Sequence, residues 1–389
     1  MPHHSIATGL LSLLMLLAGC AGHLKGSSTP LVSPASKPSS SATTTIHPHW
    51  PVLVGGYQAQ RLSGDYAGYP ALTTFIEQME VRHGFPKAYL LGVFSMARRK
   101  QWTLDYMAKE APSSRPAQVL APRPGSWNRY RGQFLTPTHI SRGVNFWNRH
   151  ATTLKQASLR YGVPEAIIMG ILGVETAYGA NLGQDRILDA LTTLAFDYPR
   201  RAEYFTGELE NFLLMTRSEA MDPAQPKGSF AGAMGLGQFM PGSFMKWAQD
   251  FDGDGRRDLW NPVDAIASIA HYFTVHDWQS GEPVVVRAKT SGERYKTLEY
   301  GYDRAYSLPQ LAAYGIVPES MLPVNASHGL PEAQFRFLRL GGDKGEEHWL
   351  GLHNFYVITR YNHSTHYAMA VYQLGAAVQQ RYQHALLQH

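Results

Sequence analysis

The chain has 389 residues, of which 44% are hydrophobic and 12% aromatic, enough for a sizeable core and compatible with two to three domains. Its 35 lysines and arginines outnumber its 30 aspartates and glutamates, which gives a net charge of +5. Only 17% of the residues are charged and no dense run of lysine and arginine occurs. This composition excludes a nucleic-acid-binding surface as the main feature of the protein.

The first twenty residues have the pattern of a secretory signal. Residues 6–18 form an apolar run, shorter than the about 20 residues that a membrane-spanning helix needs. The run ends in Leu-Ala-Gly-Cys at 17–20, which resembles the bacterial lipobox. The resemblance implies that Cys20, the single cysteine, carries a lipid that anchors the mature chain. His3 and His4 replace the usual basic residues, so a cleaved signal with a chance cysteine is the alternative.

The residues after the cysteine bear on location and reach. Ala21 is not the aspartate that retains such proteins in the inner membrane, so the same resemblance implies an outer-membrane anchor facing the periplasm. Residues 21–51 are rich in serine, threonine, proline and alanine, a composition typical of a disordered linker. We expect residues 52–389 to form the folded region.

The folded region is predicted to be mainly helical. Apolar residues recur at helical spacing between proline starts and glycine stops. The predicted helices span residues 72–84, 86–99, 137–161, 164–178, 187–198, 200–219, 241–250, 262–277 and 364–382. Four prolines within 111–126 predict a loop. The stretch 283–358 is mixed, with β-like pieces at 284–287 and 335–338, which predicts a smaller β-containing lobe.

Glu175 interrupts an apolar helix face. Ile168, Leu172 and Glu175 have i, i+4, i+7 spacing, so their side chains share one face of the helix predicted at 164–178. Loss of water and the negative end of the helix dipole both raise the pKa of a carboxyl group there. A carboxylic acid that stays protonated near neutral pH suits cleavage of a glycosidic bond. A structural glutamate paired with an arginine or a backbone group is the alternative.

Two other segments favour a ligand-binding site. Residues 228–241 contain four glycines, which let a backbone approach a ligand closely, and Gln238, whose amide both donates and accepts hydrogen bonds. Arg200 and Arg201 stand at a predicted helix start, where the dipole disfavours positive charge. That cost suggests that they hold an anionic group of a ligand. A glycine-rich turn and a solvated charge pair are the respective alternatives.

Together these segments resemble the lytic murein transglycosylase B family, relatives of lysozyme that act on peptidoglycan. The matching strings lie at 173–179, 197–205, 229–241, 250–264 and 354–362, followed by Tyr367. The resemblance runs from about residue 70 to the end of the chain. It implies a lysozyme-like helical catalytic domain that cleaves the β-1,4 bond between N-acetylmuramic acid and N-acetylglucosamine without water.

The resemblance also implies a role for Glu175. The carboxyl group would protonate the departing glycosidic oxygen, and the carboxylate would then take a proton from the muramoyl 6-hydroxyl, which attacks the anomeric carbon. The product would be a 1,6-anhydro ring. The motif around Glu175 contains no second acid, as expected if the enzyme lacks the carboxylate pair of a hydrolase.

The same motif matching predicts the substrate cleft and the partners. Tyrosine rings suit such a cleft because their faces stack on sugar rings. The predicted substrate-binding residues are Tyr130, Arg200, Arg201, Ser229, Gln238, Tyr272, Tyr361, Asn362 and Tyr367. The expected partners are peptidoglycan strands, the membrane through the lipid, and other cell-wall enzymes. Neither nucleic acid nor an organic cofactor is expected.

Residues 250–259 contain the opening half of an EF-hand calcium loop. Asp250, Asp252 and Asp254 occupy positions 1, 3 and 5, with glycine at 6 and the carbonyl of Arg256 at 7. Position 12 is asparagine rather than glutamate, and the family resemblance implies that Asp264 replaces it. We expect a structural calcium site of modest affinity, with sodium as the alternative ion. An acidic turn without metal is the other interpretation.

Three rival functions remain open from the sequence. A true hydrolase would need a second carboxylate facing Glu175. A non-catalytic glycan-binding scaffold would leave Glu175 exposed or in a structural ion pair. A calcium-dependent adhesion module is disfavoured because the sequence has one calcium-like loop.

Overall fold

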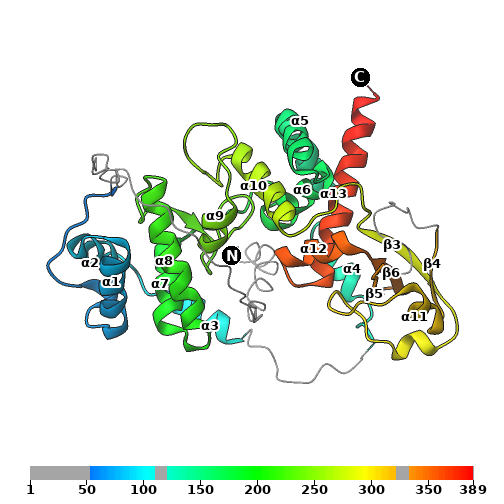
Figure 1. The fold of residues 1–389 in the computed structure, drawn as a ribbon, viewed down its shortest axis with the longest axis horizontal. Helices are drawn as coiled ribbons and strands as arrows, with labels where there is room; N and C mark the ends of the chain where they lie inside the picture. Colours follow the sequence, from blue (N-terminus) through cyan, green and yellow to red (C-terminus); the bar gives the residue numbers. More distant parts are fainter. Residues whose placement is uncertain (1–52, 110–120, 321–332, 389) are drawn as a thin grey trace, which may run out of the picture.

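The computed structural model describes residues 53–109, 121–320 and 333–388. The predicted signal, Cys20 and the predicted linker lie outside these ranges, as do residues 111–120 of the predicted loop. The described chain forms a helical body with a small antiparallel sheet at the end opposite helices α1 and α2 (Figure 1). The predicted mainly-α fold class with a β-containing part is therefore confirmed.

Helices make up most of the described chain. They are α1 Pro70–His83, α2 Lys87–Ser95, α3 Gln101–Lys109, α4 Ser126–Arg131, α5 Pro137–Tyr161, α6 Glu165–Thr176, α7 Ile187–Asp197, α8 Ala202–Ser218, α9 Pro241–Trp247, α10 Pro262–Val275, α11 Leu308–Ala313, α12 His353–Tyr361 and α13 Thr365–Leu386. Short 3-10 turns lie at Gly64–Tyr66, Pro199–Arg201 and Arg294–Thr297. The nine predicted helices are all present, whereas α3, α4, α11 and α12 were not predicted.

Local sequence signals explain why α5 matches its predicted span of 137–161. Thr136 caps its start by accepting a hydrogen bond from the backbone of His139, and Pro137 occupies the first turn. Gly162 ends it in the left-handed conformation with φ of 70°. Both ends are thus encoded in the residues next to them.

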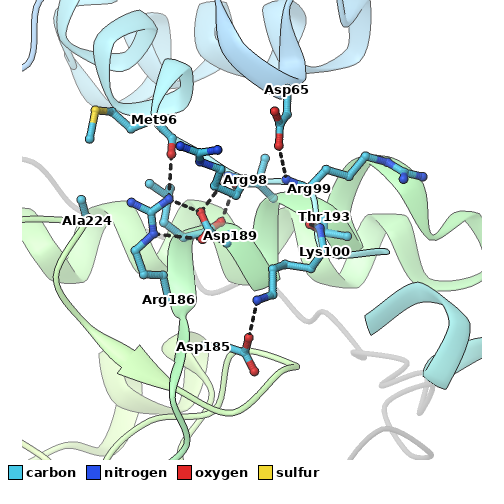
Figure 2. A network of polar contacts seen from close by, with 12 residues as sticks. Asp65, Met96, Arg98, Arg99, Lys100, Asp185, Arg186, Asp189, Thr193 and Ala224 are labelled. Atoms are coloured by element: carbon cyan, nitrogen blue, oxygen red, sulfur yellow. Dashed lines mark hydrogen bonds and ion pairs between the residues drawn. The ribbon is translucent and has the colours of Figure 1, made fainter. Parts of the chain in front are cut away.

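Helix α2 ends at Ser95 rather than near residue 99, because the residues that follow bind to α7 (Figure 2). The backbone N–H of Arg98 donates to Asp189, and that of Lys100 donates to the hydroxyl of Thr193. These N–H groups cannot also continue the hydrogen-bond ladder of α2. The prediction that this helix reaches residue 99 was wrong for that reason.

An ion-pair network fastens this connection to the helical body (Figure 2). Arg186 donates two hydrogen bonds to the nearly buried carboxylate of Asp189 and a third to the carbonyl of Met96. The ammonium of Lys100 lies 2.7 Å from Asp185. Asp185 and Arg186 form strand β1, Asp185–Arg186, so the network reaches the strand that pairs with β2, Lys227–Gly228.

Helices α6 and α13 cross in the centre of the body (Figure 1) with their backbones in close approach. A Cβ on Gly170 of α6 would lie 2.2 Å from the carbonyl oxygen of Val371. A Cβ on Gly375 of α13 would lie 2.0 Å from that of Ala166. Only glycine permits this crossing, which fixes the positions of the residues at the ends of both helices.

The second sheet forms the smaller lobe. It has the order β4-β3-β6-β5, all antiparallel, with β3 Val285–Thr290, β4 Ile316–Pro318, β5 Arg336–Gly342 and β6 Gly345–Gly351. It has its own small apolar cluster, which includes Leu311, Phe337 and Leu350. Its edge strand toward the body is β5, since α4 packs against β5.

The smaller lobe is shorter than the predicted 283–358, because helix α12 belongs to the helical body. The α12 residues Phe355 and Ile358 are buried in the core cluster of the helical body. Asn354 binds the carbonyls of Gln279 and Glu282, which holds the helix start against the body. The sheet-bearing part therefore ends before His353.

The described residues include no single helix that is long and apolar enough to cross a membrane. One bent pair, Pro137–Tyr161 with Glu165–Thr176 at 116°, meets the length and composition criteria only jointly.

Candidate active site

Glu175 lies in the last turn of α6, as predicted, and is 7% exposed. Every residue of α6 from Ile167 to Thr176 is buried, so water has little access to this carboxyl group. Burial raises the pKa of Glu175 to about 8, and the hydrogen bond from Tyr367 offsets part of the rise. The group therefore holds its proton at neutral pH.

Tyr367 is the hydrogen-bond partner of Glu175. It lies in the first turn of α13, where the side chain of Ser364 caps the helix by accepting from its backbone N–H. Its hydroxyl donates to Oε1 of Glu175 at 2.5 Å. Burial and the Glu175 charge raise the pKa of Tyr367 well above its ordinary value, so its hydroxyl remains a donor.

The other predicted tyrosines surround this pair. Tyr361 stacks on Tyr367 with centroids 6.5 Å apart and an angle of 13°, and its pKa is raised by burial and by the Glu175 charge. Tyr272 meets Tyr361 edge-on at 4.8 Å. Tyr130 also lies close enough to raise the pKa of Tyr367, although burial, Glu175 and Tyr361 raise it more. The structure thus links the four predicted tyrosines to Glu175, Tyr367 directly and the others through Tyr367 or Tyr361.

Asn362 follows α12 at the position next to Tyr361. It is 1% exposed and its backbone is extended. The buried hydroxyl of Tyr361 donates to the carbonyl of Gly237, which ties this corner to the glycine-rich segment. Asn362 therefore belongs to the same region as the tyrosines.

The glycine-rich segment 228–241 holds Ser229 and Gln238 by backbone contacts. The hydroxyl oxygen of Ser229 accepts hydrogen bonds from the N–H groups of Ala231 and Ala233. Gln238 has a left-handed backbone with φ of 52°, and its amide donates to the carbonyl of Gly235. Because the amide nitrogen of Gln238 braces the segment, its oxygen is the group that suits a ligand donor.

Thr176 joins the end of α6 to this segment, a role that the sequence did not reveal. Its hydroxyl, fully buried, lies 3.0 Å from the carbonyl of Leu236, to which it donates, and it accepts from the N–H of Gly179. Leu236 in turn donates its N–H to the carbonyl of Leu259, beside the acidic loop. Only its position after Glu175 could have drawn attention to Thr176.

Arg200 and Arg201 lie in the 3-10 turn Pro199–Arg201, and α8 begins at Ala202, two residues after the predicted helix start at 200. Arg200 is exposed. The guanidinium of Arg201 lies 4.2 Å from the ring centroid of Tyr204 and 5.6 Å from that of Phe205. Neither arginine is among the causes of the raised pKa of Glu175. The contacts of the described residues therefore do not join them directly to the carboxyl group.

The three aspartates of the predicted metal loop converge. Carboxylate oxygens of Asp250, Asp252 and Asp254 lie within 4.8 Å of one another, and all three residues are exposed. Gly253 and Gly255, with φ of 77° and 88°, make the turns that bring them together. Three like charges this close repel unless a cation joins them, so the donor set fits a hard divalent ion.

Asp264 and Arg256 have other contacts in this loop. The buried carboxylate of Asp264 accepts from the N–H groups of Phe251 and Asp258, at 2.8 Å each. It is not part of the cluster of converging carboxylates, so the prediction of Asp264 as a ligand is not met in this geometry. The backbone N–H of Arg256 donates to Asp254.

The chemistry available at the site is proton transfer by one carboxyl group. The two causes of the pKa shift of Glu175 are burial and Tyr367, and no second carboxylate of the described residues is among them. Aromatic faces lie beside an acid that stays protonated at neutral pH, and Thr176 joins its helix to the segment that carries Ser229 and Gln238. This arrangement suits protonation of a leaving oxygen in a polyhydroxylated ligand.

Comparisons with known proteins agree with this chemistry. A family model described as the transglycosylase SLT domain matches residues 68–376. The chain is 47% identical to the membrane-bound lytic murein transglycosylase B of Escherichia coli (strain K12) over 370 residues, 95% of this chain and 96% of that protein.

Solved structures extend the likeness to the fold. The Escherichia coli lytic transglycosylase SLT35 in complex with calcium is 48% identical, with a TM-score of 0.75, over 83% of this chain and 96% of that one. SltB3 of Pseudomonas aeruginosa in complex with NAG-anhNAM-pentapeptide is 28% identical, with a TM-score of 0.66, over 79% of this chain and 78% of that one.

The raised pKa of Glu175 predicts a specific dependence of stability on pH. A carboxyl group that folding protonates adds stability that is fully present below its ordinary pKa of 4.5 and is lost as pH rises through about 8. In Glu175→Gln this contribution cannot titrate. We expect urea unfolding to show the wild-type free energy of unfolding falling relative to that of Glu175→Gln across this range.

Exposed Glu203 on α8 provides the control. Glu203→Gln should follow the wild-type curve. A difference between wild type and Glu175→Gln that stays constant between pH 4.5 and 8 would contradict the burial of an ionisable carboxyl group.

Proposed function

The chain belongs to the family of lytic murein transglycosylases, which are peptidoglycan-cleaving lyases, and from this membership we propose that Glu175 is the single acid and base of its reaction. The observation that carries the proposal is the burial of Glu175 with Tyr367 as its hydrogen-bond donor. A protonated acid in an apolar setting is what departure of a glycosidic oxygen needs.

The proposed reaction uses one carboxyl group twice. Glu175 gives its proton to the oxygen that links N-acetylmuramic acid to N-acetylglucosamine, and the glycosidic bond breaks. The resulting carboxylate takes the proton of the muramoyl 6-hydroxyl while that oxygen bonds to the anomeric carbon. The proton count returns to its start, and the product is a 1,6-anhydro ring. The Tyr367 hydroxyl steadies the carboxylate between the two steps.

The segment around Glu175 contains no second acid, which supports this reaction over hydrolysis. A hydrolase places a second carboxyl group about 5–10 Å from the acid. The substrate's own hydroxyl takes the place of water in our proposal, so Glu175 needs no such partner.

We propose that the residues around Glu175 bind the glycan. The tyrosine faces suit sugar rings, and the Gln238 carbonyl suits a hydroxyl or amide donor. Arg200 and Arg201, farther along the chain at α8, suit the lactyl or peptide carboxylates of the substrate. The full set is Tyr130, Arg200, Arg201, Ser229, Gln238, Tyr272, Tyr361, Asn362 and Tyr367.

The experiment is digestion of purified peptidoglycan followed by mass spectrometry of the soluble products. Wild-type protein should release muropeptides with 1,6-anhydro ends, and Glu175→Gln should lower the rate by at least about a hundredfold, since it removes general acid catalysis. Glu165→Gln is the matched control, because Glu165 begins the same helix and also has a raised pKa. It should retain activity.

Products that have gained water would sink the transglycosylase reaction. Unchanged activity of Glu175→Gln would sink the assignment of Glu175, whatever the products are.

We further propose that the acidic loop binds calcium. A relative's structure contains calcium, and the converging carboxylates of Asp250, Asp252 and Asp254 suit it here. The carbonyl of Arg256 would complete the ring of ligands, and Asp264 would brace the loop through its bonds to the N–H groups of Phe251 and Asp258. Bound calcium would neutralise the repulsion among the three carboxylates and so stabilise the fold.

Thermal unfolding after EDTA treatment tests this site. Added calcium at about 100 times its Kd should stabilise the protein by ~2.7 kcal/mol, and Asp254→Asn should lose most of that gain. Asp303→Asn, a change at an exposed aspartate elsewhere, should keep it. An equal gain from sodium would assign the loop to sodium, and no gain from either ion would contradict a metal site.

The cellular location that we propose is the periplasmic face of the outer membrane. The relative from Escherichia coli is named as membrane-bound, and in this chain Cys20 would carry the lipid anchor. Residues 21–51 would tether the catalytic region 52–389. Mass spectrometry of the mature N-terminus decides whether a lipid is attached to Cys20. The proposed partners are peptidoglycan strands and other cell-wall enzymes.

A further inference from the structure

We propose that Trp102 and Tyr106 on α3 form an additional sugar-binding subsite, which extends the glycan cleft beyond Glu175 and the residues assigned above. We call this pair the α3 platform. The proposal rests on the proposed function, because it takes the occupant to be the same peptidoglycan strand.

Helix α3 presents the platform in a fixed position. Its residues Thr103 and Met107 are buried at i, i+4 spacing. Trp102 and Tyr106 have the same spacing one residue earlier, so they share the neighbouring face. The backbone of Lys100, just before the helix, is bonded to Thr193 of α7 (Figure 2).

The two platform rings stack on each other and rest on Phe230. The rings of Trp102 and Tyr106 lie 5.2 Å apart at an angle of 20°. Both meet Phe230 edge-on, at centroid distances of 5.6 Å and 5.1 Å. Such edge-to-face contacts hold rings in place, so the platform keeps its orientation without a ligand.

Phe230 connects the platform to the site. It is 3% exposed and directly follows Ser229 in the glycine-rich segment. Ser229 is one of the proposed substrate-binding residues, and strand β2 before it pairs with β1, where Lys100 binds Asp185. The platform is therefore continuous with the proposed cleft.

Trp102 is left open to solvent. Half of its surface is exposed, whereas the other tryptophans of the described ranges are buried or half-buried. An aromatic face backed by a second ring is the surface on which a pyranose ring stacks.

The charges around the platform favour a sugar over a lipid surface. Helix α3 contains one aspartate and one lysine, so it lacks the basic face of a membrane-binding helix. Two of the three basic residues before it are paired, Lys100 with Asp185 and Arg99 with Asp197. A glycan chain longer than the two sugars at the cleaved bond, with its sugar faces turned to the rings, fits this surface.

The experiment measures binding of peptide-free glycan oligosaccharides to the Glu175→Gln protein by titration calorimetry. A tetrasaccharide and a strand of eight or more sugars are compared, with and without Trp102→Ala. We expect the change to weaken binding of the long strand about tenfold, the equivalent of ~1.4 kcal/mol, and to leave tetrasaccharide binding unchanged. Trp102→Phe should restore most of the long-strand affinity.

Val81→Ala is the matched surface control, because Val81 is an exposed apolar residue of α1. It should bind both lengths like the parent. Equal losses for both lengths with Trp102→Ala would assign Trp102 a structural role, and no loss for either would overturn the subsite. Binding of the parent to phosphatidylglycerol vesicles that Trp102→Ala abolishes would reassign the platform to a membrane.

The result is separable from the test of Glu175. Product masses of the active Trp102→Ala enzyme report the reaction, whereas the length dependence of binding reports the platform. A parent protein that binds neither oligosaccharide would overturn both the platform and the glycan cleft.

Discussion

The site depends on the removal of water from one carboxyl group. Glu175 is buried where α6 ends, and Tyr367 approaches it from the start of α13. This meeting is possible because glycines at 170 and 375 let the two helices cross with backbone contact. Larger residues at the crossing would separate the helices and admit water, and the pKa of Glu175 would fall toward its ordinary value.

A line of hydrogen bonds extends this geometry to the rest of the proposed cleft. Thr176, the residue after the acid, binds Leu236 of the glycine-rich segment, and Leu236 binds Leu259 at the end of the acidic loop. An ion in that loop would thus stabilise the same backbone that presents Ser229 and Gln238. The proposed calcium site and the proposed active site are therefore connected through one backbone. A structural metal in the loop would help to hold the active-site residues in position.

The sequence predicted those helices and site residues whose signals lie in neighbouring residues of the chain. Helix α5 was predicted within its bounds because its cap, its proline and its terminal glycine are adjacent to it. Glu175 stood out because a carboxyl group broke an apolar face on one helix. Tyr367, in contrast, lies 192 residues from its partner, and only the family resemblance named it.

The missed elements depend on distant partners in the same way. At the start of helix α12, the side-chain amide of Asn354 donates hydrogen bonds to the carbonyls of Gln279 and Glu282. Helix α3 is short, and its aromatic residues form an ordered platform only through their contacts with Phe230. Neither contact has a signature in the residues next to it, so the α3 platform could be recognised only from the fold.

The pH dependence of kcat/KM on soluble glycan strands tests most directly whether the buried Glu175 carboxyl group is the acid. We predict that kcat/KM falls on the alkaline side with an apparent pKa of about 8. In Tyr367→Phe the lost hydrogen bond should move that limb to higher pH while the maximal rate drops, because the donor lowers the pKa of Glu175 in the wild type. An alkaline limb near the ordinary pKa of glutamate, or a limb that Tyr367→Phe leaves in place, would contradict the assignment of the buried Glu175 carboxyl group as the acid.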